Sequence, residues 1–254
     1  NCTSLKSIYL PDSLKKIGSA AFFNCNSLST VNMPEGIESV GGNVFDGTEV
    51  FENSVADEYG SVYLGKVLLY NKGLNSTVIV KDSTKVIANA VFINNSGLRE
   101  IELPEGIVEI GDSCFENCKA LKKIDIKEGL KKIGANAFSQ SGIAEVKLPE
   151  SITEIGYGAF NNCEDLSGIN LPIGIESIAG YSFENTKYLN NIKPDEYGCK
   201  YVDNILLASE NNNGSSIIHI KAGTRLIAEQ VFENRKDIEE IYIPKSVETI
   251  DFKA

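Results

Sequence analysis

Hydrophobic residues recur along the chain with a period of about 23 residues, and phenylalanine marks this period most clearly. The repeated phenylalanines are Phe22, Phe45, Phe92, Phe115, Phe138, Phe160, Phe183 and Phe232. Neighbours in the series lie 22 or 23 residues apart, except across two intervals of 47 and 49 residues, which are about two periods each. A fixed period of about 20–50 residues is typical of repeat proteins, in which similar units stack along one elongated core.

Each unit combines a short alternating segment with a segment that ends in a large buried side chain. In Ile101-Glu102-Leu103 the aliphatic residues alternate with a polar one, which predicts a β-strand with one inward face. Pro104 has no backbone N–H and predicts the end of that strand. The Ile110-Gly111 step predicts a bend where a side chain would be crowded. The pair Ala137-Phe138 predicts a small and a large interior plug on a turn of helical or 3₁₀ form.

One such unit cannot enclose a core, so the units must stack, with each strand paired to the next at about 4.8 Å. The chain is therefore predicted to be a single solenoid over residues 1–254. Its class is an α/β repeat rich in β-structure, with a parallel β-sheet along one face. The last segment, IYIPKSVETIDF, begins a unit that the chain does not finish, so we expect a fragment of a longer chain.

The unit resembles that of the BspA-like leucine-rich repeat family, Leu-Pro-x-x-Ile-x-x-Ile-Gly-x-x-Ala-Phe-x-x-Cys-x-x-Leu. Segments such as IELPEGIVEIGDSCF and VKLPESITEIGYGAF carry it, and VIVKDSTKVIANAVF and IHIKAGTRLIAEQVF are weaker copies. The chain departs from the pattern at the cysteine position of several units. That position is occupied by Cys2, Cys25, Cys118, Cys163, Thr48, Asn95, Ser141, Thr186 and Arg235.

The tetrapeptide DEYG occurs at residues 57–60 and again at 195–198, which are 138 residues, or six periods, apart. Each copy lies in one of the two long intervals and precedes a β-rich run. We therefore predict two β-hairpin-like insertions, at about 48–76 and 186–215, closed through 71–73 and 211–214. We interpret DEYG as a turn, with Gly60 and Gly198 at positive φ and the acids facing water. A catalytic pair would need desolvation and a partner that the sequence does not supply.

The sequence lacks the residue patterns that catalytic and cofactor-binding sites require. The one histidine, His219, falls on an outward strand position, where we expect a solvent-facing side chain. There is no CxxC or HExxH spacing and no phosphate-binding loop. We therefore predict that the chain is not an enzyme and binds no cofactor or metal.

The six cysteines are interpreted mainly as reduced side chains. Four of them share the position that small polar residues fill in other units, which suits a buried thiol. A disulfide between Cys2 and Cys25, on consecutive units, stays open, as does proximity of Cys114 and Cys118. Cys199 stands alone in the second insertion.

The charge and hydropathy of the chain restrict its partners. With 35 acidic and 24 basic residues the net charge is −11, which disfavours nucleic acid and anionic lipid surfaces. No run approaches the roughly 20 apolar residues that span a bilayer, so we predict no membrane insertion by this segment.

Outward positions of the strands form two rows that vary from unit to unit, whereas the inward positions Ile101, Leu103, Ile124 and Leu148 stay aliphatic. We predict ligand binding through these outward residues: Tyr9, Asn32, Glu100, Glu102, Lys123, Asp125, Glu145, Lys147, Asn170, His219, Glu240 and Tyr242. The family resemblance implies an extracellular or cell-surface adhesion module of a microbe, whose partner is a host matrix protein or a microbial surface protein. The alternative is a structural stalk that displays another domain, and uncapped repeats also favour end-to-end self-association.

Overall fold

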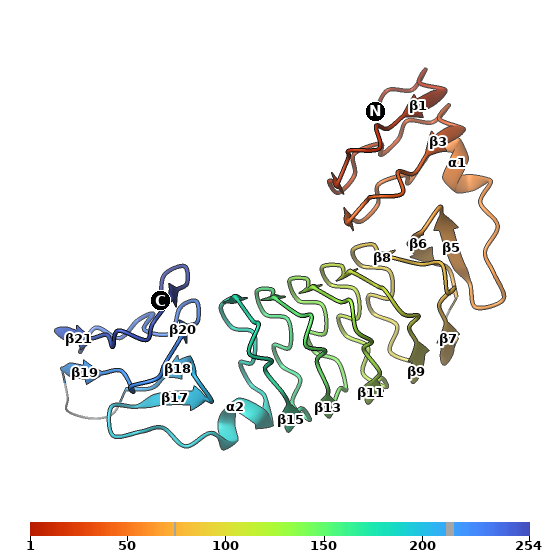
Figure 1. Ribbon diagram of the computed structural model, residues 1–254. Helices are drawn as coiled ribbons and strands as arrows, with labels where there is room; N and C mark the ends of the chain where they lie inside the picture. The colour runs from red at the N-terminus through yellow and green to blue at the C-terminus, as the bar shows by residue number, and fades with distance from the viewer. Residues whose placement is uncertain (74, 212–215) are drawn as a thin grey trace.

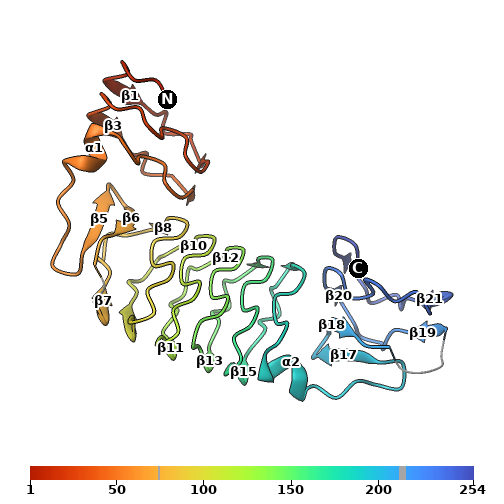
Figure 2. The ribbon, with the colours of Figure 1, turned by 180° about the vertical axis from the view of Figure 1, so that it is seen from behind.

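Each coil contributes short parallel strands to two sides of the structure, a computed structural model that describes residues 1–73, 75–211 and 216–254. About ten turns of roughly 23 residues stack into a β-solenoid with almost no helix, which confirms the predicted fold class. The coils follow an arc with the two termini toward its ends (Figure 1). Seen from behind, one row of strands lies on the inner side of the arc and the other on the outer side (Figure 2).

The outer, convex side carries the predicted alternating strands. They pair in parallel one repeat apart, as in the pairing of Glu145 with Gly168. Their inward residues, such as Ile101 and Leu148, are buried as predicted. The convex strands are β1 (Ser7–Tyr9), β3 (Thr30–Asn32), β7 (Thr77–Ile79), β9 (Glu100–Glu102), β11 (Lys123–Ile124), β13 (Glu145–Val146), β15 (Gly168–Ile169), β19 (Ile217–His219) and β21 (Glu240–Tyr242).

A second row of strands, on the concave side, was not predicted. It runs through the Ile-Gly step, where the sequence suggested only a bend, and it includes the longest sheet of the protein, ordered β16-β14-β12-β10-β8-β6-β5. Its strands from the regular coils are β2 (Lys16–Ile17), β4 (Ser39–Val40), β8 (Val86–Ile87), β10 (Glu109–Ile110), β12 (Lys132–Ile133), β14 (Glu154–Ile155), β16 (Ser177–Ile178), β20 (Leu226–Ile227) and β22 (Thr249–Ile250).

Glycine after the concave strand is required by the close approach of the neighbouring coil. A Cβ on Gly111 would lie 2.7 Å from backbone atoms of Ala88 and Asn89. The predicted crowding at this position is therefore confirmed, although its cause is the stacking of coils.

The phenylalanines form a ladder of stacked rings inside the coils. Phe115 and Phe138 have ring centroids 5.2 Å apart, and Phe138 and Phe160 are also 5.2 Å apart. All three side chains are fully buried. The predicted interior plugs are thus confirmed, and their spacing is close to the roughly 4.8 Å between paired strands.

The segment that carries each ladder phenylalanine is a series of turns and not the predicted helical or 3₁₀ form. Ser113 and Asn117 have φ values of 52° and 60°, in the left-handed region, so a right-handed helix cannot run through them. The N–H of Phe115 donates instead to the carbonyl oxygen of Ala137 in the next coil, at 2.7 Å. The turns therefore add another line of hydrogen bonds between coils.

Each insertion begins with one helical turn and continues into an antiparallel hairpin. The helices are α1 (Glu49–Glu52) and α2 (Lys187–Asn191), capped by the hydroxyls of Thr48 and Thr186. The hairpins are β5 (Ser61–Leu64) with β6 (Val67–Asn71) and β17 (Cys199–Val202) with β18 (Ile205–Ser209).

The turns that close the hairpins differ from those predicted. Gly65 and Lys66 join β5 to β6, and Asp203 and Asn204 join β17 to β18, so the closure through 71–73 is wrong. Residues 212–214 of the other proposed closure lie outside the described residues. Gly65 and Asp203 have φ values of 58° and 50°, which two-residue hairpin turns favour at their first central position.

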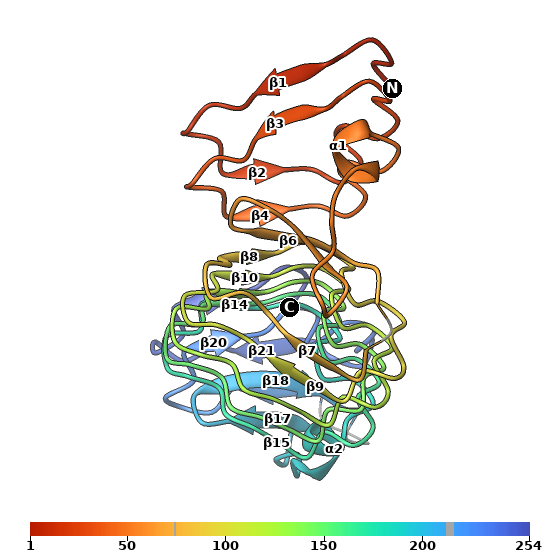
Figure 3. The same cartoon turned by 90° about the vertical axis from the view of Figure 1, so that its right-hand side faces the viewer.

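Both hairpins enter the coil stack as wedges. β6 pairs with β8. The N–H of Asn89, just after β8, nevertheless donates to the carbonyl oxygen of Val40, in the coil before the insertion, at a distance of 3.0 Å. In the same way, β18 pairs with β20, while the backbone N–H of Glu229 donates to the carbonyl oxygen of Ile178, in the coil before the second insertion, at 3.0 Å. The array bends at these places, and in Figure 3 the coils of β1 to β4 rise away from the stacked central coils.

Replacing Phe138 with alanine should lower the free energy of unfolding by about 3–5 kcal/mol, because the cavity lies at the centre of the ladder. Tyr9→Ala is the control, since this ring is 78% exposed and its removal should cost less than about 0.5 kcal/mol. Urea denaturation followed by circular dichroism measures both. Equal, small losses for the two variants would contradict a ladder that stabilises the coils.

Candidate interaction surfaces

The residues predicted to bind a ligand are all exposed, and they lie on the convex side of the arc. The charges at its centre are largely unused by the fold. Among the described residues, Glu102, Lys123 and Lys147 form no side-chain ion pair. Asp125 pairs with Lys127 in the same coil. The centre of the convex side therefore offers both signs of charge to a partner.

Two of the predicted binding residues use their amides within the fold. Asn32 accepts a hydrogen bond from the N–H of Leu10 at 2.7 Å and donates to its carbonyl oxygen at 2.9 Å. Asn170 makes the same pair of contacts with Leu148, at the same distances. Each asparagine stands in the coil just before an insertion. Its side-chain amide replaces a backbone peptide group in the hydrogen bonding of the sheet. The sequence pattern does not distinguish this structural role from a role in binding.

Aromatic side chains continue the convex row toward the C-terminal end. His219 stacks on Tyr242 with centroids 4.6 Å apart and packs at 5.6 Å from Tyr197. The Tyr242 hydroxyl donates to Glu240 at 2.7 Å. His219 is exposed, as predicted, and its ring is part of an aromatic row.

The concave side presents a second set of polar and charged groups, some of which contact one another across coils. Ser39 donates to Glu109 at 3.1 Å, and Lys132 forms an ion pair with Glu154 at 3.1 Å. Burial raises the pKa of Glu109, against the opposing effects of Ser39 and Lys132. Burial by itself would lower the pKa of Lys132, but Glu154 raises it. These groups stabilise neighbouring coils.

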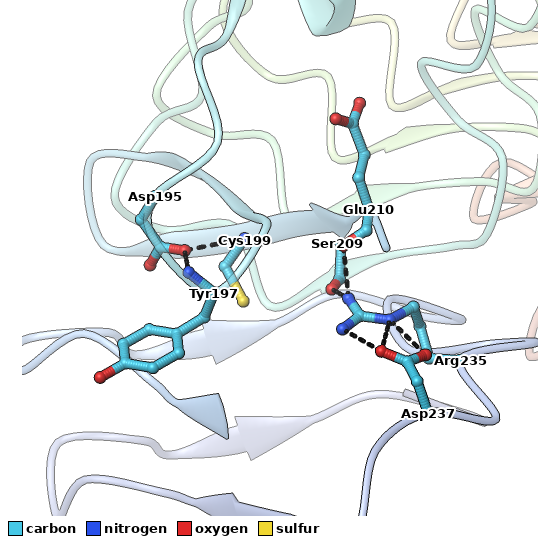
Figure 4. Close-up of polar contacts among 7 residues, drawn as sticks. All are labelled: Asp195, Tyr197, Cys199, Ser209, Glu210, Arg235 and Asp237. Atoms are coloured by element: carbon cyan, nitrogen blue, oxygen red, sulfur yellow. Dashed lines mark hydrogen bonds and ion pairs between the residues drawn. The ribbon is translucent and has the colours of Figure 1, made fainter. Parts of the chain in front are cut away.

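The DEYG segments are turns built around an aspartate, as Figure 4 shows for the second one. One carboxylate oxygen of Asp195 accepts the N–H groups of Tyr197 and Cys199, both at 2.9 Å. Gly198 has a φ of 80°, which confirms the predicted glycine conformation. The prediction that the acids face water is wrong for the aspartates, because Asp57 and Asp195 are half-buried and hold the backbone of the turn.

An arginine joins the second hairpin to the coil that follows it (Figure 4). Arg235 occupies the cysteine position, and its side chain is 6% exposed. Its guanidinium donates to both carboxylate oxygens of Asp237, at 2.9–3.2 Å, and to the carbonyl oxygen of Glu210 at 2.6 Å. It also contacts the hydroxyl of Ser209. In the coil that follows the first insertion the equivalent residue is Asn95, which is buried without such contacts among the described residues.

A cavity lies beside each hairpin, where the wedge separates two coils. The first, of about 300 Å³, is mainly apolar, with Phe51, Leu69, Tyr70 and Ile93 among its walls. The second, of about 320 Å³, occupies the equivalent place. At the positions of Phe51, Tyr70 and Ile93 it has Leu189, Ala208 and Glu233, so the two cavities share a location and differ in chemistry. The sequence pattern gave no sign of them, because they depend on the wedge.

Side chains at the cysteine position donate hydrogen bonds to the backbone carbonyl oxygens of the ladder phenylalanines. The thiol of Cys163 donates to the carbonyl oxygen of Phe138 at 2.9 Å, and that of Cys118 donates to Phe92 at 3.1 Å. Thr48 and Thr186 make the same type of contact within their own coils, to Phe45 and Phe183. All six cysteines are free, so the preferred interpretation is confirmed and the alternative Cys2–Cys25 disulfide does not form.

A metal cluster and a membrane-spanning helix are both absent from the part of the chain that the structure describes. No cluster of three or more histidine, cysteine, aspartate or glutamate side chains is arranged to hold a metal ion there. None of the helices within that part has the length and apolarity to cross a membrane.

The repeat matches the model of a known protein family. The model of the BspA type leucine rich repeat region (6 copies) matches residues 1–63, 62–190 and 131–254. The chain belongs to this family. Leucine-rich repeat proteins are generally binding or scaffold modules. The chain has no significant match among curated protein sequences.

Solved structures of bacterial repeat proteins are similar to this chain. The pneumococcal vaccine antigen PcpA aligns with 98% of this chain and 68% of its own, at 19% identity and a TM-score of 0.52. The T. pallidum leucine-rich repeat protein TpLRR aligns with 96% of this chain and 86% of its own, at 20% identity and a TM-score of 0.43. A leucine-rich repeat protein from Bacteroides ovatus covers 98% and 75%, at 20% identity and 0.37. The similarity to PcpA shows a common fold.

Replacing Asp57 with alanine should lower the free energy of unfolding by about 1–3 kcal/mol, because the N–H groups of Tyr59 and Ser61 lose a charged acceptor. Glu58→Ala removes the exposed acid next to it and should cost less than about 0.5 kcal/mol. Urea denaturation measures both. Equal effects of the two variants would contradict a structural role specific to the aspartate.

Native protein treated with iodoacetamide near neutral pH should be modified at Cys2, which is exposed, and protected at Cys118 and Cys163. Burial raises the pKa of these thiols to about 12 and about 11, and only the thiolate reacts. Mass spectrometry of the peptides, with and without urea, measures the rates. Modification of Cys118 as fast as Cys2 in the native protein would contradict the burial of this position.

Proposed function

We propose that this chain is a non-enzymatic interaction module of a bacterial cell-surface or secreted protein and that its convex side binds a host or microbial protein. The observation that supports this most strongly is the row of exposed charges centred on Glu102, Lys123 and Lys147, which form no ion pair with any residue that the structure describes. Charges of this kind, in a row that carries the exposed Tyr9 and Tyr242 at its two ends, suit the rim and contacts of a protein interface.

The length of the array also suits such a partner. Strands spaced at about 4.8 Å over about ten coils give a face on the order of 50 Å long, enough for an interface of standard size. The ladder and the hydrogen bonds between coils hold this face in one shape. A preformed face loses little conformational entropy on binding.

The bacterial surface location rests on two supports. The family model covers the whole chain, and the similar structures include PcpA, whose name describes it as a pneumococcal vaccine antigen. An extracellular setting also fits a chain whose charge of −11 keeps it in solution.

The triple variant Glu102→Ala, Asp125→Ala, Lys147→Ala tests the convex face. In surface plasmon resonance against a panel of matrix proteins, mucins and microbial surface proteins, we expect the variant to lose at least tenfold in affinity for the partner that the native chain binds. Rim charges contribute to encounter rate and specificity, and their loss should appear first in the association rate.

The matched control is Lys131→Ala, Glu176→Ala, Glu248→Ala, which changes the net charge equally at exposed positions outside the convex strands. Equal loss in both variants would show that the overall charge governs binding and would contradict a site on the convex face. Lack of binding to every member of the panel would favour a stalk. Sedimentation equilibrium run alongside shows whether the chain associates with itself through the exposed Ile243, Ile250 and Phe252 of its last coil.

A further inference from the structure

The two coils on either side of the first hairpin touch at one point and separate beyond it. They are joined where the N–H of Asn89 donates to the carbonyl oxygen of Val40 at 3.0 Å. Past this bond lies the first junction pocket, which is the cavity of about 300 Å³ beside β6. Its walls include Asn43 and Phe45 of the coil before the hairpin and Asn89 and Ile93 of the coil after it.

Neighbouring coils of the regular array are joined at this place by a line of three backbone hydrogen bonds. The N–H groups of Ser113, Phe115 and Asn117 donate to the carbonyl oxygens of residues 135, 137 and 139 of the next coil, at 2.7–2.8 Å. In that next coil, the N–H groups of residues 136, 138 and 140 donate onward in the same way, at 2.8–2.9 Å. A coil inside the array therefore both accepts and donates at alternate residues.

The line is interrupted at the first junction. The equivalent donors are the N–H groups of Asn43, Phe45 and Gly47, and the equivalent acceptors are the carbonyl oxygens of residues 89, 91 and 93. None of these six groups has a hydrogen-bond partner among the described residues. Phe45 and Val91 are only 3% and 5% exposed, and a buried backbone group without a partner costs free energy. The pocket is thus flanked by unused donors on one coil and unused acceptors on the other.

The donors keep the conformation that they have in the regular array. The φ values of Asn43 and Gly47 are 55° and 69°, and those of the equivalent Ser113 and Asn117 are 52° and 60°. The edge of this coil is therefore already shaped to pair with another segment of backbone. A preformed edge loses little conformational entropy when a ligand binds.

The equivalent gap at the second junction is bridged by the protein's own side chains. The hydroxyl of Tyr181 donates to Glu233 of the facing coil at 2.6 Å, and Glu229 of that coil accepts an N–H across the gap at 3.1 Å. Asn43 and Ile93 stand at the positions of Tyr181 and Glu233. Among the residues that the structure describes, no side-chain hydrogen bond crosses the first gap, so the first junction stays open.

The side chains of the first junction pocket define what could enter it. Phe51 and Tyr70 meet edge to face at 5.3 Å, and Leu69 lies beside them. Tyr70 and Ile93 are 38% and 40% exposed, which is high for large apolar side chains. The volume is at the low end for a ligand site. These walls suit one apolar side chain, while the unused backbone groups suit a polypeptide backbone.

We propose that the first junction pocket binds a short peptide segment of a protein partner. The backbone of the segment pairs with the two separated coils as a neighbouring coil would, and one apolar side chain enters the cavity. Pairing of an added segment with an open edge gives affinity through the backbone and specificity through the side-chain pocket. The inference rests on the proposed function only for the source of the segment, because the pocket lies apart from the charges of the convex side.

The test titrates the whole chain, labelled with ¹⁵N, with the peptide acetyl-Ala-Asn-Ala-Phe-Ser-Gln-amide. This is the sequence of residues 135–140, which supplies the carbonyl oxygens and the N–H groups of the line in the regular array. Saturable shifts should cluster at the amides of Asn43, Phe45 and Gly47. No saturable shift would overturn the proposal, as would shifts confined to the last coil, where the peptide would only extend the array.

Two control peptides separate the contributions of side chain and backbone. A peptide with serine in place of its phenylalanine should bind at least tenfold more weakly, because the apolar anchor is lost. A peptide methylated at the backbone nitrogens of its asparagine and phenylalanine should also bind at least tenfold more weakly, because it cannot donate to the unused carbonyl oxygens. Equal binding of all three peptides would overturn the proposal.

Matched variants locate the site on the protein. Ile93→Glu places a carboxylate in the wall, as in the second cavity, and should weaken binding of the first peptide at least tenfold. Ile173→Glu makes the same change at another exposed isoleucine and should leave binding unchanged. Equal weakening by both would overturn the proposal. If the peptide does not bind but partner binding still depends on the convex charges, the pocket is refuted and the proposed function stands, and the reverse result does the opposite.

Discussion

Stacking of phenylalanine rings from successive coils is the interaction on which the rest of this structure depends. The centroids of Phe92, Phe115, Phe138 and Phe160 repeat at 5.2–5.3 Å, near the spacing of the strands outside them. One coil encloses too few apolar atoms to be stable, so each gains its core from its neighbours. The close approach of backbones at Gly111 and the thiol contacts of the cysteine position follow from the same spacing. As a consequence for function, the exposed residues of successive coils are held at a fixed spacing.

The two insertions vary this scaffold without ending it. A threonine at the cysteine position starts each helical turn, an aspartate binds the DEYG backbone, and the hairpin then enters the stack as a wedge. Arg235 ties the second wedge to its coil, whereas Asn95 stands at the same place after the first. The same architecture therefore yields one apolar cavity and one acidic cavity. The repeated architecture determines where the cavities lie, and the individual residues that line each cavity determine its chemistry.

The sequence predicted the parts of the fold that follow from periodicity. Alternation identified strands such as β9 and the exposure of Glu102, and the phenylalanine period identified the ladder. It missed the concave strands, because two residues such as Glu109 and Ile110 are too short to show alternation. It placed the hairpin turns in the most polar segments, although positive φ at Gly65 and Asp203 decided their position. Of the surfaces, exposure was predictable, but the backbone role of Asn32 and the two cavities required the packing of separate coils.

Hydrogen–deuterium exchange, read residue by residue, tests the central role of stacking most directly. The N–H groups of Phe115 and Phe138 donate to Ala137 and Ala159 of the next coils at 2.7 and 2.8 Å. If the stacked coils form one cooperative unit, these amides should be among the slowest to exchange and should exchange at a common rate. Fast exchange in this segment, with the slowest amides confined to the hairpins, would show that the insertions and not the ladder hold the array together.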